Sequence, residues 1–435
     1  MPALAEPRSL PALLERLPAP LGGRLGAIRA AARELRIETW WVGGGVRDLL
    51  RGEPTADFDL VVEGARRAER LAAGLAEALG GRLRRHDRFL TATVELDDGA
   101  AVDVAAARSE RYEAPGALPR VEPAGLDRDL QRRDFTINAL ALRIEPPPPE
   151  LRDPVGGRAD LAAGRLRVLH GASFRDDPTR ILRGLRFERR FGFRFESATE
   201  AQAREALGGA ALAGVSGDRL RCELALLLDA TGNLVQAFAR GAELGLWKAL
   251  DPDLEGAHPG AELIAKWVET VAALDWAGRD PGAPSAWRLA LLLLAVPLAR
   301  PARRRLAARL ALAAGERELV VAGPDRVERA GSLLARESEP PAHAVARALA
   351  PCSAEELAAV AARGPGARRW VERDLAELRP LRLRVRGADL VAAGLPPGPG
   401  IRRALERTRE ARLDARIGAG DELRFALQSF EEAEG

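Results

Sequence analysis

The stretch Gly43-Gly44-Gly45-Val46-Arg47-Asp48 is followed nine residues later by Asp57-Phe58-Asp59. The run Thr39–Val42 before the glycines predicts a short strand, and the residues after them favour a helix. Backbone N–H groups at such a turn approach a phosphate closely, because glycine has no side chain and tolerates unusual dihedral angles. Three glycines alone are typical of a turn, and a lone Asp-x-Asp is typical of a solvated strand end. Together at this spacing they indicate a phosphate site beside a metal site.

The two aspartates are candidate metal ligands. Residues i and i+2 of a strand point to one face, so Asp57 and Asp59 would present two carboxylates side by side. Mg²⁺ binds through one or two such carboxylates and the phosphates of a substrate. Asp103 lies in the otherwise apolar run Ala101–Ala105, where a carboxylate needs a partner or a metal. We expect Asp103 to be a third metal-site carboxylate, the alternative being an ordinary aspartate at a strand edge.

Strand-like and helix-like segments alternate from about residue 35 to residue 144, which predicts a mixed α/β unit. The further predicted strands are Phe58–Val62, Ala92–Leu96, Ala101–Ala105 and Ile137–Ile144. Several prolines and a Pro-Gly pair between Ser109 and Asp129 predict a long irregular loop, and loops of this length are often functional. From about Asp176 onward nearly every segment has the 3.6-residue period of a helix.

Two further motifs carry charged residues in a pattern that suits a nucleotide. Arg133 and Asp134, with Asn138 close behind, could bind a triphosphate and a ribose through charge-assisted hydrogen bonds. The alternative is that they only cap the apolar run that follows.

The second of these motifs begins at Asp176-Asp177-Pro178, which is typical of a helix start. Arg180, Arg183 and Arg186 recur every three residues along the predicted helix. Asp177 and Arg180 present an acceptor and a fork of donors one turn apart, as reading the edge of a base requires. Such a row could also be the solvated basic face of an amphipathic helix.

Composition sets limits on the class of protein. A chain of 435 residues with 47% hydrophobic residues has material for two to four domains, and we place them at residues 1–145, 146–250, 251–340 and 341–435. The formal net charge of +3 gives no global basic field, so a nucleic-acid partner would require locally segregated charge. Two distant cysteines and the lack of a signal-peptide pattern lead us to expect a cytoplasmic protein.

In their order and spacing, these motifs resemble those of the class II tRNA nucleotidyltransferase and bacterial poly(A) polymerase family. The resemblance spans about Trp40 to Leu228 and resumes weakly at Gly387–Leu390 and Gly394–Gly400. It implies an α/β head of the nucleotidyltransferase (polymerase beta-like) type with a mixed sheet, followed by an elongated all-α neck, body and tail. The head would be the catalytic palm, residues 146–250 the nucleotide-reading neck, and residues 341–435 an RNA-binding tail.

The resemblance also implies roles for individual residues. Asp57 and Asp59, with Asp103 as the candidate third ligand, would bind catalytic Mg²⁺. Asp177 and Arg180 would act as an amino-acid template that pairs with C or A. The other residues assigned to the nucleotide site are Gly44, Gly45, Arg47, Asp48, Arg133, Asp134, Asn138, Arg183 and Arg186.

The expected activity is CCA addition to the 3′ end of tRNA from CTP and ATP, without a nucleic-acid template. The full-length segment between Arg108 and Asp129 argues against an enzyme that adds only CC, because CC-only relatives lack this loop. Addition of A alone beside a separate CC-adding enzyme, poly(A) addition, and a catalytically silent RNA-binding protein stay open. A basic excess in the tail is the candidate RNA-binding surface, for which we name Arg382, Arg384, Arg386, Arg402 and Arg403.

Overall fold

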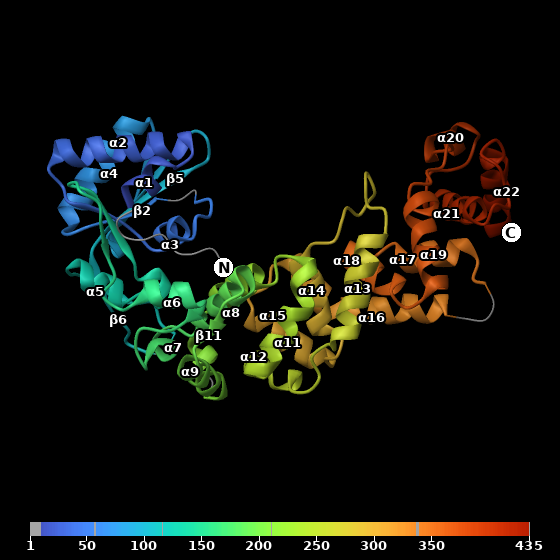
Figure 1. Cartoon of the computed structure of the whole chain (residues 1–435). Helices are drawn as coiled ribbons and strands as arrows, with labels where there is room; N and C mark the ends of the chain where they lie inside the picture. Colours follow the sequence, from blue (N-terminus) through green and yellow to red (C-terminus); the bar gives the residue numbers. More distant parts are fainter. Residues whose placement is uncertain (1–9, 56–57, 115, 210, 336–338, 435) are drawn as a thin grey trace. The chain divides into compact units, whose positions relative to one another are not determined.

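The computed structural model describes residues 10–55, 58–114, 116–209, 211–335 and 339–434. The chain divides into two compact units, residues 1–223 and 224–435, which are taken in turn (Figure 1). The division into four domains that the sequence suggests is finer than these two units and stays a prediction. Asp57, one of the two candidate metal ligands, lies outside the described residues.

The first unit is built on a seven-stranded mixed sheet with the order β3-β4-β5-β2-β1-β8-β9. Its central pair, β2 and β5, is parallel, and the other neighbours are antiparallel. The strands are β1 (Thr39–Val42), β2 (Phe58–Val62), β3 (Arg82–His86), β4 (Thr91–Glu95), β5 (Ala101–Ala106), β8 (Ala141–Glu145) and β9 (Glu150–Arg152). The mixed α/β head expected from the sequence is therefore confirmed.

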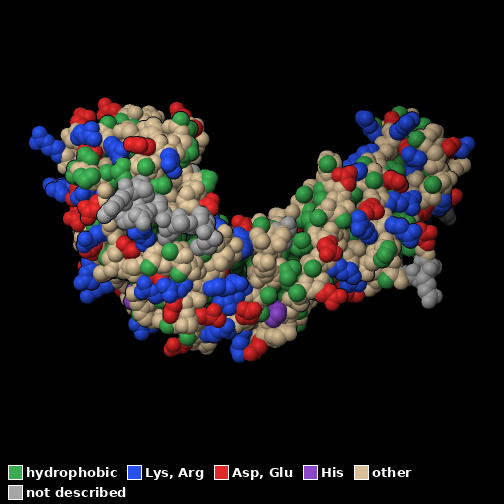
Figure 2. All heavy atoms as spheres, in the orientation of Figure 1, with side chains coloured by type: hydrophobic (Ala, Val, Ile, Leu, Met, Phe, Trp, Pro, Cys, Tyr) green, Lys and Arg blue, Asp and Glu red, His purple; other side chains and the backbone are tan. Residues whose placement is uncertain are grey.

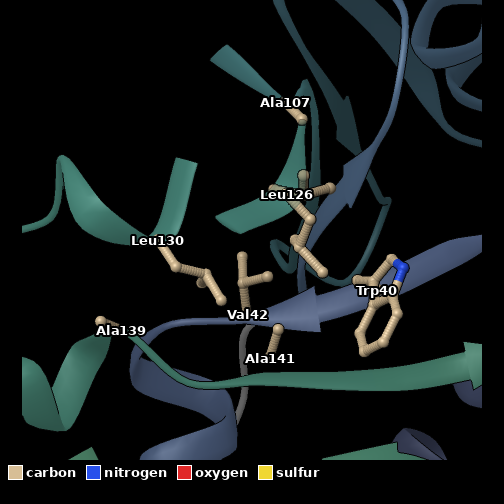
Figure 3. Packing of buried hydrophobic residues seen from close by; sticks show 8 residues of the cluster. Trp40, Val42, Ala107, Leu126, Leu130, Ala139 and Ala141 are labelled. Carbon is tan, nitrogen blue, oxygen red and sulfur yellow. The ribbon is translucent and has the colours of Figure 1, made fainter. Parts of the chain in front are cut away.

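The two faces of this sheet have different covers. Helix α4 (Ala65–Leu79) packs on β4 and β5 and against α2 (Ala19–Leu35), over the fully buried side chains of Val94, Val102 and Val104. On the other face, Trp40, Val42 and Ala141 pack against Leu126 and Leu130 of α5 (Leu126–Gln131), as Figure 3 shows. Ala105 packs at the margin of this second cluster.

The segment predicted as an irregular loop is more regular than expected. β6 (Arg108–Arg111) and β7 (Arg120–Pro123) form an antiparallel hairpin of their own, and α5 follows it. The prediction was wrong because the two strands pair only with each other and bury little. The face of β6 that is shielded carries the charged residues Arg108 and Glu110, so the sequence shows no alternation of apolar and polar residues.

Helices connect the sheet to the rest of the first unit. Helix α3 (Gly44–Arg51) follows the glycines, and α8 (Thr179–Phe191) follows Asp177 and Pro178. The other elements of this part are α1 (Leu10–Glu15), α6 (Gly157–Ala163), β10 (Arg165–Leu166), α7 (Ser173–Asp176), β11 (Arg194–Phe195), α9 (Ser197–Gly208) and α10 (Gly217–Leu227), the last of which runs into the second unit.

The regular secondary-structure elements described in the second unit are all helices. Its helices are α11 (Leu234–Leu244), α12 (Leu246–Leu250), α13 (Ala261–Ala273), α14 (Ala286–Ala295), α15 (Arg300–Arg309), α16 (Ala314–Leu334), α17 (Ala342–Leu349), α18 (Ala354–Ala361), α19 (Pro365–Arg373), α20 (Gly387–Ala392), α21 (Pro399–Leu413) and α22 (Glu422–Glu434). The leucines at positions 289 and 291–294 are all fully buried in α14. None of the helices in the described residues combines the length and the apolar character that crossing a membrane requires.

Candidate active site

The glycine turn between β1 and α3 brings three parts of the site together. Gly43 has φ 75°, a conformation that favours glycine. A Cβ atom at Gly43 would lie 2.7 Å from Nη1 of Arg133 and 3.7 Å from Oδ2 of Asp59. Gly45 is restricted for a different reason, since a Cβ there would lie 2.4 Å from Nε1 of the buried Trp41. The turn is thus packed on both sides, and Asp59 and Arg133 both lie beside it.

The candidate metal ligands lie on neighbouring parallel strands. Asp59 of β2 pairs in register with Asp103 of β5, so both carboxylates belong to the same face of the sheet. Thr93 of β4 is the next residue in this cross-strand row, and its Oγ1 donates a hydrogen bond of 2.5 Å to Oδ1 of Asp103. Within the described residues, no group of three or more His, Cys, Asp or Glu side chains is arranged to hold a metal ion.

The donor set nevertheless fits Mg²⁺. Asp59 and Asp103 offer hard carboxylate oxygens from adjacent strands, and Asp103 is exposed at the face that α5 leaves open. Mg²⁺ needs only one or two protein carboxylates when substrate phosphates complete its shell. Mg²⁺ held by Asp59 and Asp103, with Asp57 as a further ligand, stays a prediction.

Arg47 and Asp48 lie inside the protein. Arg47 is only 4% exposed, and it donates to both carboxylate oxygens of Asp48 at 2.9 Å and to Oδ1 of Asn138 at 2.5 Å. Its guanidinium also lies 4.6 Å from the ring centre of Phe191 in α8. Arg47 therefore joins the glycine turn, the segment around Asn138 and α8, and its contact with a triphosphate stays a prediction.

Asp134 forms a second buried junction. Its Oδ1 accepts hydrogen bonds from Nδ2 of Asn138 and from the backbone N–H of Phe135, both at 2.8 Å, while Oδ2 pairs with Arg183 of α8 at 2.8 Å. Burial would raise the pKa of Asp134, but the Arg183 charge and the hydrogen bonds outweigh it and hold that pKa below its usual value. Asp134 is thus an ionised anchor for α8.

Arg133 is held at the glycine turn through a buried acid. Nη2 of Arg133 donates to Oδ2 of Asp129 at 3.0 Å, and Arg132 pairs with Oδ1 of the same carboxylate. Asp129 is fully buried; burial would raise its pKa, but the two arginines lower it overall. The backbone O of Arg132 accepts a 2.8 Å hydrogen bond from Nη2 of Arg180. Hydrogen bonds and ion pairs therefore run from Arg133 through Asp129 and Arg132 to Arg180, and both Arg133 and Asp59 lie beside Gly43.

The two candidate base-reading residues have internal partners in this structure. Arg180 is 5% exposed, and its Nη1 donates to Oγ of Ser173 at 2.7 Å. Asp177 precedes α8 in an extended conformation, and its Oδ1 accepts from the backbone N–H and Oγ1 of Thr179. Arg183 and Arg186, farther along the helix, both approach Glu223 of α10, at 3.6 and 3.5 Å.

Sequence reasoning missed Arg219 as a partner of Asp177. Nη2 of Arg219 lies 2.9 Å from both carboxylate oxygens of Asp177, and Nη1 donates to the backbone O of Gly116 at 3.0 Å. Gly116 belongs to the tip of the β6–β7 hairpin, and its N–H donates to the backbone O of Asp176. The only signal in the sequence was an arginine at the start of a predicted helix, which does not reveal a partner 42 residues away.

The hairpin contributes two more residues that were not singled out as partners. Glu110 accepts from Nη1 of Arg132 at 2.5 Å and from the hydroxyl of Tyr112 at 2.8 Å. Burial and the nearby Glu110 charge raise the pKa of Tyr112, so Tyr112 stays a neutral donor. The hairpin is in this way attached to the arginines of the site.

The candidate RNA-binding arginines of the tail belong to the second unit. All five are exposed: Arg382, Arg384, Arg386, Arg402 and Arg403. Arg402 pairs with Glu406 on α21, and Arg382 donates to backbone oxygens. Basic and acidic side chains are interspersed over the face shown in Figure 2. RNA binding by the tail stays a prediction.

Comparison with known sequences gives matches over different lengths of the chain. A profile of the poly A polymerase head domain matches residues 39–167. A CC-adding tRNA nucleotidyltransferase of Deinococcus radiodurans is 34% identical over 400 residues, which cover 89% of this chain and 88% of that protein. A-adding tRNA nucleotidyltransferases of Halalkalibacterium halodurans and Geobacter sulfurreducens are 44% and 34% identical over 50% and 96% of this chain. The chain spans about half the length of these two A-adding relatives, 51% and 48%.

Solved structures resemble the whole chain. An apo form of a CCA-adding enzyme superposes with a TM-score of 0.82 at 29% identity, over 99% of this chain and 100% of that one. The Thermotoga maritima CCA-adding enzyme in complex with tRNA gives a TM-score of 0.74 at 27% identity, over 100% of both chains. A CCA-adding enzyme in complex with ATP gives 0.80 at 28% identity, over 99% and 98%.

Proposed function

Because the chain belongs to the tRNA nucleotidyltransferase family, we propose that it extends the 3′ end of tRNA and adds at least the terminal A, as its A-adding relatives do. The observation that carries this proposal is that Asp59 and Arg133 lie on the same glycine turn, and that Arg133 is linked through Asp129 and Arg132 to Arg180. This arrangement places a carboxylate of the predicted metal site on the same connected group of residues as Arg180, one of the two predicted base-reading residues, as a nucleotide bound between them requires.

The proposed reaction is attack of the RNA 3′-hydroxyl on the α-phosphate of ATP or CTP. The new bond joins the 3′-oxygen to the α-phosphorus, the bond between the α- and β-phosphates breaks, and pyrophosphate leaves. Mg²⁺ bound by Asp59 and Asp103, with Asp57, would supply positive charge against the phosphates and lower the pKa of the attacking hydroxyl. The chain's own part is to hold the triphosphate at the glycine turn with Arg133 and the base near Asp177 and Arg180.

Addition of the full CCA sequence and addition of A alone are the two forms of this proposal. CCA addition is the form expected from the sequence, and solved structures of CCA-adding enzymes with ATP and with CTP support it. The A-only form is supported by A-adding relatives at 44%, 34% and 36% identity. The hairpin from Arg108 to Pro123 is compatible with both, since each requires the addition of A.

One experiment separates these forms. The full chain is incubated with Mg²⁺ and each nucleoside triphosphate on three tRNAs, which end before CCA, at CC and at CCA, and the products are sized. CCA addition predicts extension of the first two, and A-only addition predicts extension of the second alone by one A. Long A tracts on the third would indicate a poly(A) polymerase. No extension of any tRNA would overturn the proposal and leave an RNA-binding protein. We also propose the cytoplasm as the place of action, on the scarcity of cysteine.

A further inference from the structure

A row of polar side chains continues from the candidate metal ligands to the free edge of the sheet. In register, Asp59 of β2 lies opposite Asp103 of β5, Asp103 opposite Thr93 of β4, and Thr93 opposite Arg84 of β3. Residues paired in register project to the same face. The row therefore crosses four strands on one face, with carboxylates at its centre and an arginine at its outer end.

The outer end of this row is open and carries positive charge. The side chains of Arg82 and Arg84 are 80% and 59% exposed, and both pair with Glu95, at 2.7 and 2.8 Å. His86 is also exposed and belongs to the same face by alternation. On this face, the cover that α5 provides reaches Ala105 at its margin. Glu95 offsets one of the two arginine charges and fixes both guanidinium groups above the strand.

If the chain has the proposed function, the geometry of the phosphoryl transfer decides which substrate faces this surface. The attacking and leaving oxygens of a phosphoryl transfer lie roughly in line. The triphosphate is assigned to the glycine turn after β1, and β1 borders β2 on the side away from β5 and β4. An attacking 3′-hydroxyl must then approach from the opposite side, above β5, β4 and β3.

We propose that the open surface of β4 and β3 formed by Thr93, Arg84 and Arg82 binds the phosphodiester backbone of the last nucleotides of the RNA and guides its 3′-hydroxyl to Asp59 and Asp103. Continuity with the carboxylates and charge complementarity to phosphate support this occupant. Arg84 is a positioning residue in this proposal, because it holds RNA at the row's outer end and does not touch the reacting atoms.

The neighbouring residue Arg85 provides a matched control. It is exposed like Arg84, but it projects to the opposite face, where it lines a small pocket with Ala65, Ala68 and Glu69 of α4. Arg84→Ala and Arg85→Ala remove the same charge from the same strand. Equal unfolding midpoints would show that both variants are folded.

The test measures single-nucleotide addition by the full chain to a tRNA that ends in CC. Arg84→Ala is expected to raise the KM for tRNA about fivefold, which is the effect of losing one exposed ion pair. The KM for ATP should stay unchanged. Arg85→Ala is expected to change neither. The slope of log affinity for tRNA against log salt should become shallower by about 0.7 in Arg84→Ala, as for loss of one contact to a single-stranded phosphate.

A neutral methylphosphonate at each of the last three linkages of the tRNA then locates the contact. At one linkage it should weaken binding to the wild-type chain but have no further effect on Arg84→Ala. Equal KM values for tRNA in the two variants, or additive effects at every linkage, would overturn the inference. Absence of any nucleotide addition by the wild-type chain would instead count against the proposed function, and the binding measurements still decide whether Arg84 contacts RNA.

Discussion

Nη2 of Arg219 lies 2.9 Å from both carboxylate oxygens of Asp177, and the same guanidinium donates to the backbone O of Gly116. One side chain therefore holds the predicted base-reading acid and the tip of the β6–β7 hairpin together. The carboxylate of Asp177 can accept a hydrogen bond from a base only in the directions that Arg219 and Thr179 leave open. Arg219 is thus expected to restrict how a base is read.

Replacement of Arg219 by alanine should reduce base selectivity more than catalysis. Without the guanidinium, the Asp177 carboxylate is free to rotate, and the hydrogen bond it loses to a charged donor is worth about 1.5–3 kcal/mol. We expect the ratio of kcat/KM for ATP to that for the wrong nucleotides to fall roughly tenfold or more. Arg221→Ala is the control, since Arg221 pairs with the exposed Asp218 three residues away. Equal selectivity in both variants would contradict the role of Arg219.

Asp59→Ala should abolish nucleotide addition and leave tRNA binding nearly unchanged. Loss of a metal ligand removes several kcal/mol of charge stabilisation, so addition should be about a thousandfold slower or more. Addition is followed with a labelled tRNA, and binding is measured by filter retention. Asp97→Ala, in the exposed turn after β4, should behave like the wild type. Substantial activity of Asp59→Ala would remove the basis of the metal assignment.

Gly45→Ala should destabilise the first unit. The new Cβ would lie 2.4 Å from Nε1 of Trp41, which is fully buried and cannot move without displacing its neighbours. Overpacking of this kind costs about 1–3 kcal/mol in the free energy of unfolding. Urea unfolding followed by tryptophan fluorescence measures the change. Gly26→Ala in α2, where a Cβ meets nothing within 4 Å, should instead stabilise by about 0.5–1 kcal/mol.

Asp134→Asn should destabilise the protein in a way that depends on pH. Because the folded-state pKa of Asp134 is lowered, its charge stabilises the folded state fully above the unfolded pKa of about 3.9, and this contribution is lost as the pH falls through the folded value. Loss of the charged hydrogen bond to Arg183, whose side chain is 34% exposed, should cost about 1.5–3 kcal/mol at neutral pH. The difference between variant and wild type should shrink below about pH 4. Asp127→Asn, which breaks the exposed pair with Arg152, should change the free energy of unfolding little. A larger loss of stability in Asp127→Asn than in Asp134→Asn would contradict the role of Asp134 as an ionised anchor.

The sequence predicted those parts of the fold whose pattern is local. Thr39–Val42 and Phe58–Val62 were predicted with the bounds that the structure gives, because apolar runs bounded by turn residues specify strands. β3 was missed because its sequence, Arg-Leu-Arg-Arg-His, is charged and lies at the edge of the sheet, where burial does not select apolar side chains.

The candidate site was predictable as a set of residues but not as a network. Nucleotide binding by Arg47 and Arg180 stays a prediction, and the internal partners that the structure gives to both were not foreseen. Residue spacing along the chain does not reveal which side chain across 40 or 90 residues will accept a hydrogen bond. Arg219 was missed for the same reason, because its partner Asp177 lies 42 residues away. Asp129 pairs instead with Arg132 and Arg133 at spacings of three and four residues, a local helical pattern that the sequence did offer.

The crowding at position 43 has a practical consequence for attempts to change nucleotide preference by directed evolution. Every amino acid except glycine would add an atom against Arg133 in a backbone conformation that side chains avoid, so randomising this position is expected to yield mostly inactive clones. Library diversity is better placed at the Arg219 contact with Asp177 and along the hairpin tip, where substitutions leave the glycine turn intact.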